Sequence, residues 1–287
     1  MTQPNGRIES ISDTARWVAV YRAMENDRPD AHFRDPFARR LAGERGEQIM
    51  RAVPWGRWMA WAMIVRTEVF DEIILAQLRG GADTVLNLAA GLDTRPYRLP
   101  LPPSLRWVDV DLPAMIEYKR EQLAGERPVC QLESVALDLA DATARRALFE
   151  RVGAQGSRVL VVSEGLLIYL PRQDVEMLAA DLHAQPTFSH WLSDLASPIL
   201  LQWMQKRMRQ KLAEGKAAFQ FAPEEGPAFF EPHGWKLAES RWSLEEARRL
   251  HREMPAAWLM RLLSYLRGAK EREAGKRMSS IILLERV

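Results

Sequence analysis

The composition of this chain of 287 residues excludes several kinds of function. Its 40 basic and 38 acidic residues leave a formal charge of +2, which gives no reason to expect nucleic acid or an anionic membrane as a partner. The single cysteine, Cys130, rules out an intrachain disulfide and a thiolate metal cluster, so no metal site is expected. No apolar run reaches the ~18 residues that span a bilayer, and the N-terminus lacks an apolar signal core, so we expect a cytoplasmic protein.

Helices are predicted throughout the first 82 residues. The apolar spacing indicates one helix over residues 12–25, a second from about residue 36 and a third over residues 55–78. The third helix is apolar on several sides, and Arg66 is its conspicuous charge. A guanidinium held rigidly by such packing suits the recognition of a carboxylate.

Strands and helices alternate from residue 83 onward, which is the pattern of a mostly parallel sheet. Strands are predicted at 84–89, 106–110, 131–136, 158–163, 187–193, 235–240 and 280–285. Helices are predicted at 113–123, 141–152, 171–184, 198–214 and around 254–267, with a capping box at Ser243 opening another. We expect one domain over residues 1–287: a helical cover (1–82), a cofactor-binding core (83–197), a helical insertion or lid (198–234) and the C-terminal part of the sheet (235–287).

The first predicted strand ends in a turn of small residues, Ala89, Ala90 and Gly91, before a helix start near Asp93. A strand, a tight turn and a helix N-terminus let backbone approach a nucleotide closely. Twenty residues after Gly91, Asp111 ends the second strand at the spacing that a ribose-binding acid requires. Because the turn lacks the three-glycine fingerprint, a nucleoside without phosphates fits better than a pyrophosphate.

Acidic residues also end the neighbouring strands. Asp109 and Asp111 end the second strand, Asp138 follows the third and Glu164 follows the fourth. In an open α/β sheet these ends meet where ligands bind. Such an acidic rim suits a positively charged nucleoside, since it would repel a polyphosphate.

Several short segments share the pattern of a known family. They are Ser12-Asp-Thr-Ala15 with Tyr21-Arg22-Ala23, Arg34-Asp-Pro-Phe37, Val65-Arg66-Thr67, Leu88-Ala-Ala-Gly-Leu-Asp-Thr-Arg95, Val108-Asp-Val-Asp-Leu-Pro113, Asp138-Leu139 and Ser163-Glu-Gly-Leu-Leu-Ile-Tyr169. In this order they resemble the S-adenosylmethionine-dependent methyltransferases of the leucine carboxyl methyltransferase type, which include bacterial polyketide carboxyl methyltransferases. The resemblance covers roughly residues 12–287. It implies a class I methyltransferase Rossmann-like fold, with a seven-stranded, mostly parallel sheet, helices on both faces and an antiparallel last strand.

The resemblance also implies roles for individual residues. Arg66 would bind the methionine carboxylate of the cofactor, Asp111 its ribose and Asp138 its adenine, while Glu164 would face the methionine amino group or the acceptor. The expected cofactor-binding residues are Arg22, Arg66, Ala89, Ala90, Gly91, Asp93, Arg95, Asp109, Asp111, Leu112, Asp138, Leu139 and Glu164. Glu164 and Tyr169 are the candidates nearest the acceptor.

Two residues depart from the family pattern. Ala89 replaces the usual first glycine of the turn, an exchange that is tolerable if Ala89 keeps a negative φ. Asp109 stands where relatives have glutamate, so either Asp109 or Asp111 could hold the ribose.

The activity implied is O-methylation of a small-molecule or peptide acceptor. A carboxylate is already ionised at neutral pH, whereas a phenol with a pKa of about 10 needs help with its proton. We interpret His190 and His233 as structural, and the lack of a clear base favours a carboxylate over a hydroxyl. Apolar side chains for an acceptor pocket come from the cover and the insertion: Trp55, Trp58, Trp61, Trp203, Met204 and Met208.

Two other functions stay open. A nicotinamide-dependent oxidoreductase could use the same sheet, but the missing glycines and the adjacent Tyr118-Lys119 pair, in place of Tyr-x-x-x-Lys, argue against it. A relative that binds a ligand without chemistry is the other, and the presence of Arg66, Asp111 and Glu164 together makes it the weaker hypothesis.

Overall fold

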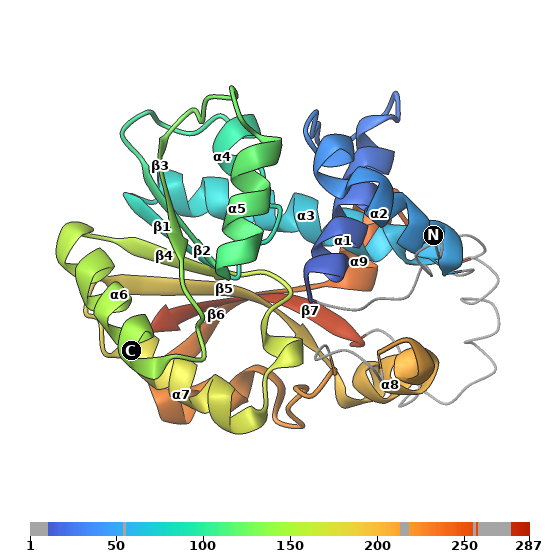
Figure 1. Ribbon diagram of the computed structural model, residues 1–287. Helices are drawn as coiled ribbons and strands as arrows, with labels where there is room; N and C mark the ends of the chain where they lie inside the picture. The colour runs from blue at the N-terminus through green and yellow to red at the C-terminus, as the bar shows by residue number, and fades with distance from the viewer. Residues whose placement is uncertain (1–10, 54–55, 213–217, 255–256, 258–276) are drawn as a thin grey trace.

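A seven-stranded sheet in the order β3-β2-β1-β4-β5-β7-β6 forms the centre of the molecule (Figure 1). The computed structural model describes residues 11–53, 56–212, 218–254, 257 and 277–287. The strands are β1 (Thr84–Leu88), β2 (Arg106–Asp111), β3 (Gln131–Ala136), β4 (Val159–Ser163), β5 (Phe188–Ala196), β6 (Trp235–Trp242) and β7 (Ser279–Arg286). Strand β7 pairs antiparallel with both β5 and β6, and the other pairs are parallel, so the predicted fold class is confirmed.

Helices cover both faces of this sheet, with α6 and α7 on one face and α3, α4 and α5 on the other (Figure 1). The helices are α1 (Ile11–Asn26), α2 (Ala38–Ala52), α3 (Gly56–Arg79), α4 (Arg95–Arg98), α5 (Pro113–Gln122), α6 (Ala142–Gln155), α7 (Arg172–His183), α8 (Pro198–Leu212) and α9 (Ser243–Arg249), with two 3-10 turns, η1 (Leu167–Tyr169) and η2 (Gly226–His233). None of the helices in these described ranges is long and apolar enough to cross a membrane.

The central strands of the sheet send alternate side chains into two separate cores, as the period of two requires. In β7, Ile282 and Leu284 join the core beneath α6 and α7, whereas Ile281 and Leu283 join the core beneath α3. All four side chains are buried. Because both faces of β7 are buried, its sequence is a continuous apolar run and not an alternation of apolar and polar residues. The sequence predicts a strand there on the basis of that run.

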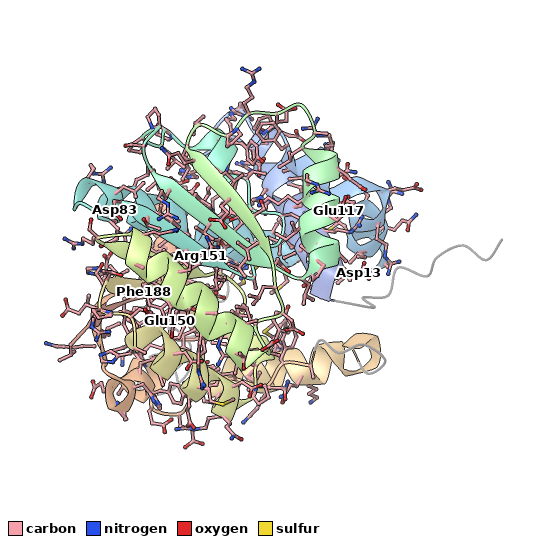
Figure 2. All side chains as sticks on the ribbon, turned by 60° about the vertical axis from the view of Figure 1, so that its left-hand side comes forward. Asp13, Asp83, Glu117, Glu150, Arg151 and Phe188 are labelled. Carbon is pink, nitrogen blue, oxygen red and sulfur yellow. The ribbon has the colours of Figure 1, made fainter. Side chains whose placement is uncertain are left out.

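The N-terminal helices α1 and α2 cover the carboxyl ends of the strands. They pack closely because Gly46 of α2 leaves room for α1: a Cβ at Gly46 would lie 2.9 Å from the backbone oxygen of Arg16. A Cβ at Gly91, beyond β1, would lie 3.5 Å from the Cβ of Ala15, so α1 rests on the turn after β1. Asp83, at the amino end of β1, and Asp13, on α1, lie on opposite sides of the molecule in Figure 2.

Most predicted elements form within a few residues of their expected bounds. Strand β3 matches the prediction, and Asp141 caps α6 by accepting hydrogen bonds from the backbone N–H groups of Thr143 and Ala144. The capping box at Ser243 is wrong, because Ser243 is the first residue inside α9 and its hydroxyl accepts a hydrogen bond from that of Ser279 at 2.8 Å. Trp55 and most of the helix predicted around 254–267 lie outside the described residues.

Candidate active site

A cavity of about 1260 Å³ opens at the carboxyl ends of the parallel strands. Its wall is formed by the turns after β1, β2, β4 and β5 and by side chains of α1, α3 and α8. Ordinary small-molecule pockets measure roughly 300–1,000 Å³. The volume of this cavity therefore exceeds that of an ordinary pocket for one small molecule.

The turn after β1 forms one edge of the cavity in a strained conformation. The backbone N–H of Ala90 donates to Val110 O at 3.0 Å, which ties the turn to β2. Ala89 has a φ of 51° and Gly91 the same value. The condition of a negative φ at Ala89 is therefore not met: the alanine adopts a left-handed conformation, at a cost of roughly 1–2 kcal/mol.

Asp111 lines the cavity beside this turn. Its Oδ2 accepts the backbone N–H of Gly91 at 2.6 Å, and its Oδ1 accepts that of Leu112 at 2.7 Å. Burial raises the pKa of Asp111 despite these two donors. Each carboxylate oxygen has a further lone pair, so Asp111 can still accept a pair of hydroxyl groups.

Asp109 is placed differently, in the interior of β2. It is fully buried and accepts hydrogen bonds from Asn87 Nδ2, Trp107 Nε1 and Lys119 Nζ at 3.0, 2.8 and 2.7 Å. It does not line the cavity, whereas Asp111 does. The geometry thus favours Asp111 as the ribose-binding acid.

Arg66, on α3, lies at the cavity wall between two carboxylates. Its Nε donates to Glu164 Oε1 at 2.9 Å and its Nη1 donates to Asp194 Oδ2 at 3.3 Å. Asp194 is itself fixed, because its Oδ1 accepts the backbone N–H of Gly165 at 2.6 Å. Nη2 of Arg66 has no hydrogen-bond acceptor among the described residues, and it remains available to a ligand.

Glu164 is held on its other side by Arg95. Its Oε2 lies 2.8 Å from Arg95 Nη1, so each carboxylate oxygen faces a different guanidinium. Burial opposes ionisation of Glu164, but Arg95 and Arg66 together outweigh it and hold the pKa of this carboxyl below its ordinary value. Glu164 is therefore a fixed anion and a poor base.

Other predicted cofactor-binding residues also reach the cavity. Asp138 and Leu139, after β3, line it together with Leu112, Ala90 and Asp93. Asp138 Oδ1 accepts the backbone N–H of Ala140 at 2.9 Å, which orients the carboxylate. All of the predicted cofactor-binding residues except Asp109 therefore line one cavity.

Arg22 and Tyr169 line the cavity from α1 and η1. Arg22 is engaged elsewhere, because its Nε donates to Asp35 at 2.8 Å and its Nη2 donates to Leu92 O at 2.6 Å. Burial raises the pKa of the Tyr169 phenol, which keeps it protonated at neutral pH. Neither side chain is a ready base.

The rest of the cavity is apolar and aromatic. Trp58, Trp61, Trp203 and Met204 line it as predicted, with Phe219 packed against Tyr169 at a ring distance of 5.3 Å. The side chain of Met208 lies outside the described residues. His190 and His233 do not line the cavity, in agreement with their structural interpretation.

Sequence reasoning missed three polar residues of this region. Asp194 follows the predicted end of strand five by one residue, so an acid at a strand end was again the available signal. Asn87 and Asp71 gave no such signal, because they face a buried network from the middle of β1 and α3. Long-range ion pairs of this kind are invisible in local sequence patterns.

Comparison with known proteins gives the chain its class. The family model for leucine carboxyl methyltransferase matches residues 15–183. A Streptomyces coelicolor protein with the provisional name S-adenosyl-L-methionine-dependent methyltransferase is 30% identical over 255 residues, 82% of this chain and 85% of the relative. A Mycobacteroides abscessus protein of the same provisional name is 36% identical over 194 residues, 60% of this chain and 61% of the relative.

Solved structures share the fold. A DUF574 family protein from Streptomyces avermitilis has a TM-score of 0.58 at 14% identity, covering 96% of this chain and 97% of its own. A provisionally named methyltransferase from Thermobifida fusca has a TM-score of 0.56 at 16% identity, with 94% of both chains covered.

The sheet order, the cavity at the strand ends and these relatives define a methyltransferase with a Rossmann-like fold. The chain belongs to the leucine carboxyl methyltransferase family, a family of S-adenosylmethionine-dependent methyltransferases. The family and the enzyme class predicted from the sequence are confirmed.

Proposed function

We propose that this chain transfers a methyl group from S-adenosylmethionine to a carboxylate oxygen of an apolar acceptor, a small molecule or a peptide end, bound in the same cavity. Transfer to a hydroxyl oxygen is the alternative. The observation that carries the proposal is the lack of a neutral-pH base: no histidine or lysine lines the cavity among the described residues. An acceptor that is already ionised needs no base.

The cofactor half of the cavity suits a positively charged nucleoside with an amino-acid tail. Asp111 would accept the ribose hydroxyls, and Asp138 and Leu139 would adjoin the adenine. Arg66 is held by two carboxylates, and its Nη2, which has no acceptor in the part of the chain that the structure describes, would donate to the methionine carboxylate. The acidic side chains around Arg66 would favour the charged sulfur and amino group of the ligand.

Bound there, S-adenosylmethionine supplies a methyl group that is already activated by the positive sulfur. The protein's own contribution is alignment and the exclusion of water. Trp58, Trp61, Phe219 and Met204 supply an apolar wall against which an acceptor can be held. Glu164 and Tyr169 are suited to fixing positions and not to removing protons, since one is a paired anion and the other a neutral phenol.

Two measurements test this function. Calorimetric titration with S-adenosylhomocysteine, with NADH in a parallel cell, should give micromolar binding of the first alone. Methyl transfer from labelled S-adenosylmethionine to a panel of apolar carboxylic acids and matched phenols should label the acids, and mild base should release the label as methanol. If only the phenols are labelled and the product is stable to base, the acceptor is a hydroxyl and not a carboxylate. If only NADH binds, the chain is not a methyltransferase.

Arg66→Gln should weaken S-adenosylhomocysteine binding by about 2 kcal/mol, the value of a charge-assisted hydrogen bond, or roughly 30-fold in Kd. Arg66→Lys should recover part of this loss, because it keeps the charge but not the planar fork. Arg252→Gln is a matched control, since Arg252 is also buried and paired, with Glu25, but does not line the cavity. If the Arg66→Gln protein binds S-adenosylhomocysteine as tightly as the wild type does, Arg66 does not contact the cofactor.

A further inference from the structure

Arg95 lies at the centre of a chain of charged side chains that runs along the cavity wall. It is 2% exposed, and all three guanidinium nitrogens are engaged. Nε donates to Asp71 Oδ1 at 2.5 Å, Nη1 donates to Asp93 Oδ2 at 2.8 Å and lies 2.8 Å from Glu164 Oε2, and Nη2 donates to Thr67 O at 3.4 Å. These partners come from α3, from the turn after β1 and from the turn after β4.

We propose that Arg95 is a positioning residue for the cofactor: without touching the ligand, it fixes Glu164 and, through Glu164, the guanidinium of Arg66. The proposal rests on the proposed function. It differs from the role that the resemblance implied, a direct cofactor contact, because Arg95 is only 2% exposed and each of its guanidinium nitrogens already has a protein partner. Glu164 is the shared element, with one oxygen on Arg66 and the other on Arg95.

Arg95 also fixes the turn after β1, through its ion pair with Asp93. Asp93 accepts hydrogen bonds from Arg95 Nη1, from the backbone N–H of Arg95 at 2.9 Å and from Asn87 Nδ2 at 3.1 Å. Burial opposes ionisation of Asp93, but Arg95 and then Lys119 reverse the balance and hold the pKa of Asp93 well below its usual range. The two edges of the proposed cofactor site, at β1 and at β4, thus share one guanidinium.

The charge balance of the cluster depends on this residue. Three guanidiniums (Arg66, Arg95 and Arg98) face four carboxylates (Asp71, Asp93, Glu164 and Asp194), which leaves one excess negative charge. The neighbouring pair of Lys119 and Asp109 adds one charge of each sign and leaves this balance unchanged. Without Arg95, two guanidiniums face the same four carboxylates. The pKa values of Glu164 and Asp93 would then rise, and a protonated Glu164 would no longer hold Arg66.

The test is calorimetric titration of S-adenosylhomocysteine into wild type, Arg95→Gln and Arg95→Lys at pH 5.5, 6.5 and 7.5. The wild type should bind with a nearly constant Kd. Arg95→Gln should bind more weakly, by a factor on the order of 10–100 at pH 7.5, the effect typical of a lost supporting partner. Its Kd should rise further toward pH 5.5, and Arg95→Lys should restore part of both effects.

Asp71→Asn provides a second route if Arg95→Gln does not fold. Asp71 holds Arg95 and Arg98 and does not itself line the cavity. Asp71→Asn should therefore weaken S-adenosylhomocysteine binding several-fold although it removes no lining side chain. Arg252→Gln again serves as the buried control, and it should lower stability without changing Kd or its pH dependence.

The outcomes separate the two proposals. A folded Arg95→Gln or Asp71→Asn protein with the wild-type Kd at all three pH values would overturn the positioning role. The same pH dependence in Arg252→Gln would also overturn it, by showing that any lost buried pair has this effect. Failure of the wild type to bind S-adenosylhomocysteine would instead reject the proposed function.

Discussion

At the turn after β1, an alanine occupies a backbone conformation that only glycine adopts without strain. Ala89 and Gly91 have the same φ of 51°, so the pair allows a reciprocal exchange at the same value of φ. The sequence showed that Ala89 departs from the family pattern but could not show its φ, because the conformation is imposed by the anchoring of Ala90 to β2.

Ala89→Gly should stabilise the protein by up to about 1 kcal/mol, the left-handed penalty less the entropy that a new glycine loses on folding. Gly91→Ala should destabilise it by roughly 1 kcal/mol through the same penalty, since its new Cβ would make only an ordinary contact with Ala15. Urea unfolding of both variants measures the two effects. If Ala89→Gly lowers the stability of the protein, the backbone at Ala89 is not strained as proposed.

A second residue-scale effect concerns Glu68 on α3. Burial, reinforced by the carboxylates of Asp71 and Glu72, raises the pKa of Glu68 to about 7. A raised pKa means that the folded state binds the proton more tightly, so this stabilisation is complete below the ordinary carboxyl pKa and is lost as the pH rises toward 7. The wild type should therefore lose stability across this interval.

Glu68→Gln should abolish that loss. The difference in unfolding free energy between the variant and the wild type should therefore rise by roughly 1–3 kcal/mol from pH 5 to pH 8. Denaturant unfolding at the two pH values gives the comparison. Glu47→Gln is the control, because Glu47 pairs with Arg39 away from Glu68, so its loss should leave the pH dependence of the wild type unchanged. If the unfolding free energies of the Glu68→Gln protein and the wild type change equally with pH, the raised pKa of Glu68 does not cause the loss of stability.

At the scale of elements, the sequence predicted helices and strands correctly where residues close together in the chain determine the structure. The β-branched run before Ser163 and the acid Asp141 ahead of a helical pattern each predicted an element that formed. The capping box at Ser243 was wrong because Trp242 is the N-cap and Ser243 lies inside α9, where its hydroxyl bonds with that of Ser279 on β7. The same limit applies to the site: acids at strand ends were found, whereas Asp71 and its partners on distant elements were not.

Gly46 shows a case in which tertiary packing reverses a helix propensity. In an isolated helix, Gly→Ala should gain about 1 kcal/mol. Here the new methyl group would meet Arg16 O at 2.9 Å and a Val20 methyl at 3.1 Å, so Gly46→Ala should instead destabilise the protein by roughly 1–3 kcal/mol. Thermal unfolding decides the sign, with the exposed change Arg51→Ala on the same helix as a near-neutral control.

At the scale of the whole molecule, the helical cover and the sheet are predicted to unfold together. Leu41 lies in the core of the cover and Leu284 in the core beneath α6 and α7, and both are fully buried. Leu41→Ala and Leu284→Ala should each cost about 2–5 kcal/mol and shift one common transition. Two transitions, with Leu41→Ala moving only one, would divide the chain into separate domains.

The place of β7 in the sheet also orders the assembly of the protein in time. Strand β6 precedes β7 along the chain, yet its hydrogen-bonded neighbour in the sheet is β7, which separates it from β5. A ribosome therefore releases β6 before β7, its only neighbour in the described sheet, has been made. During synthesis, β1 to β5 can form a parallel sheet early, while β6 waits with unpaired backbone for a strand that arrives later. Chaperones that shield such edges would find their substrate in this interval.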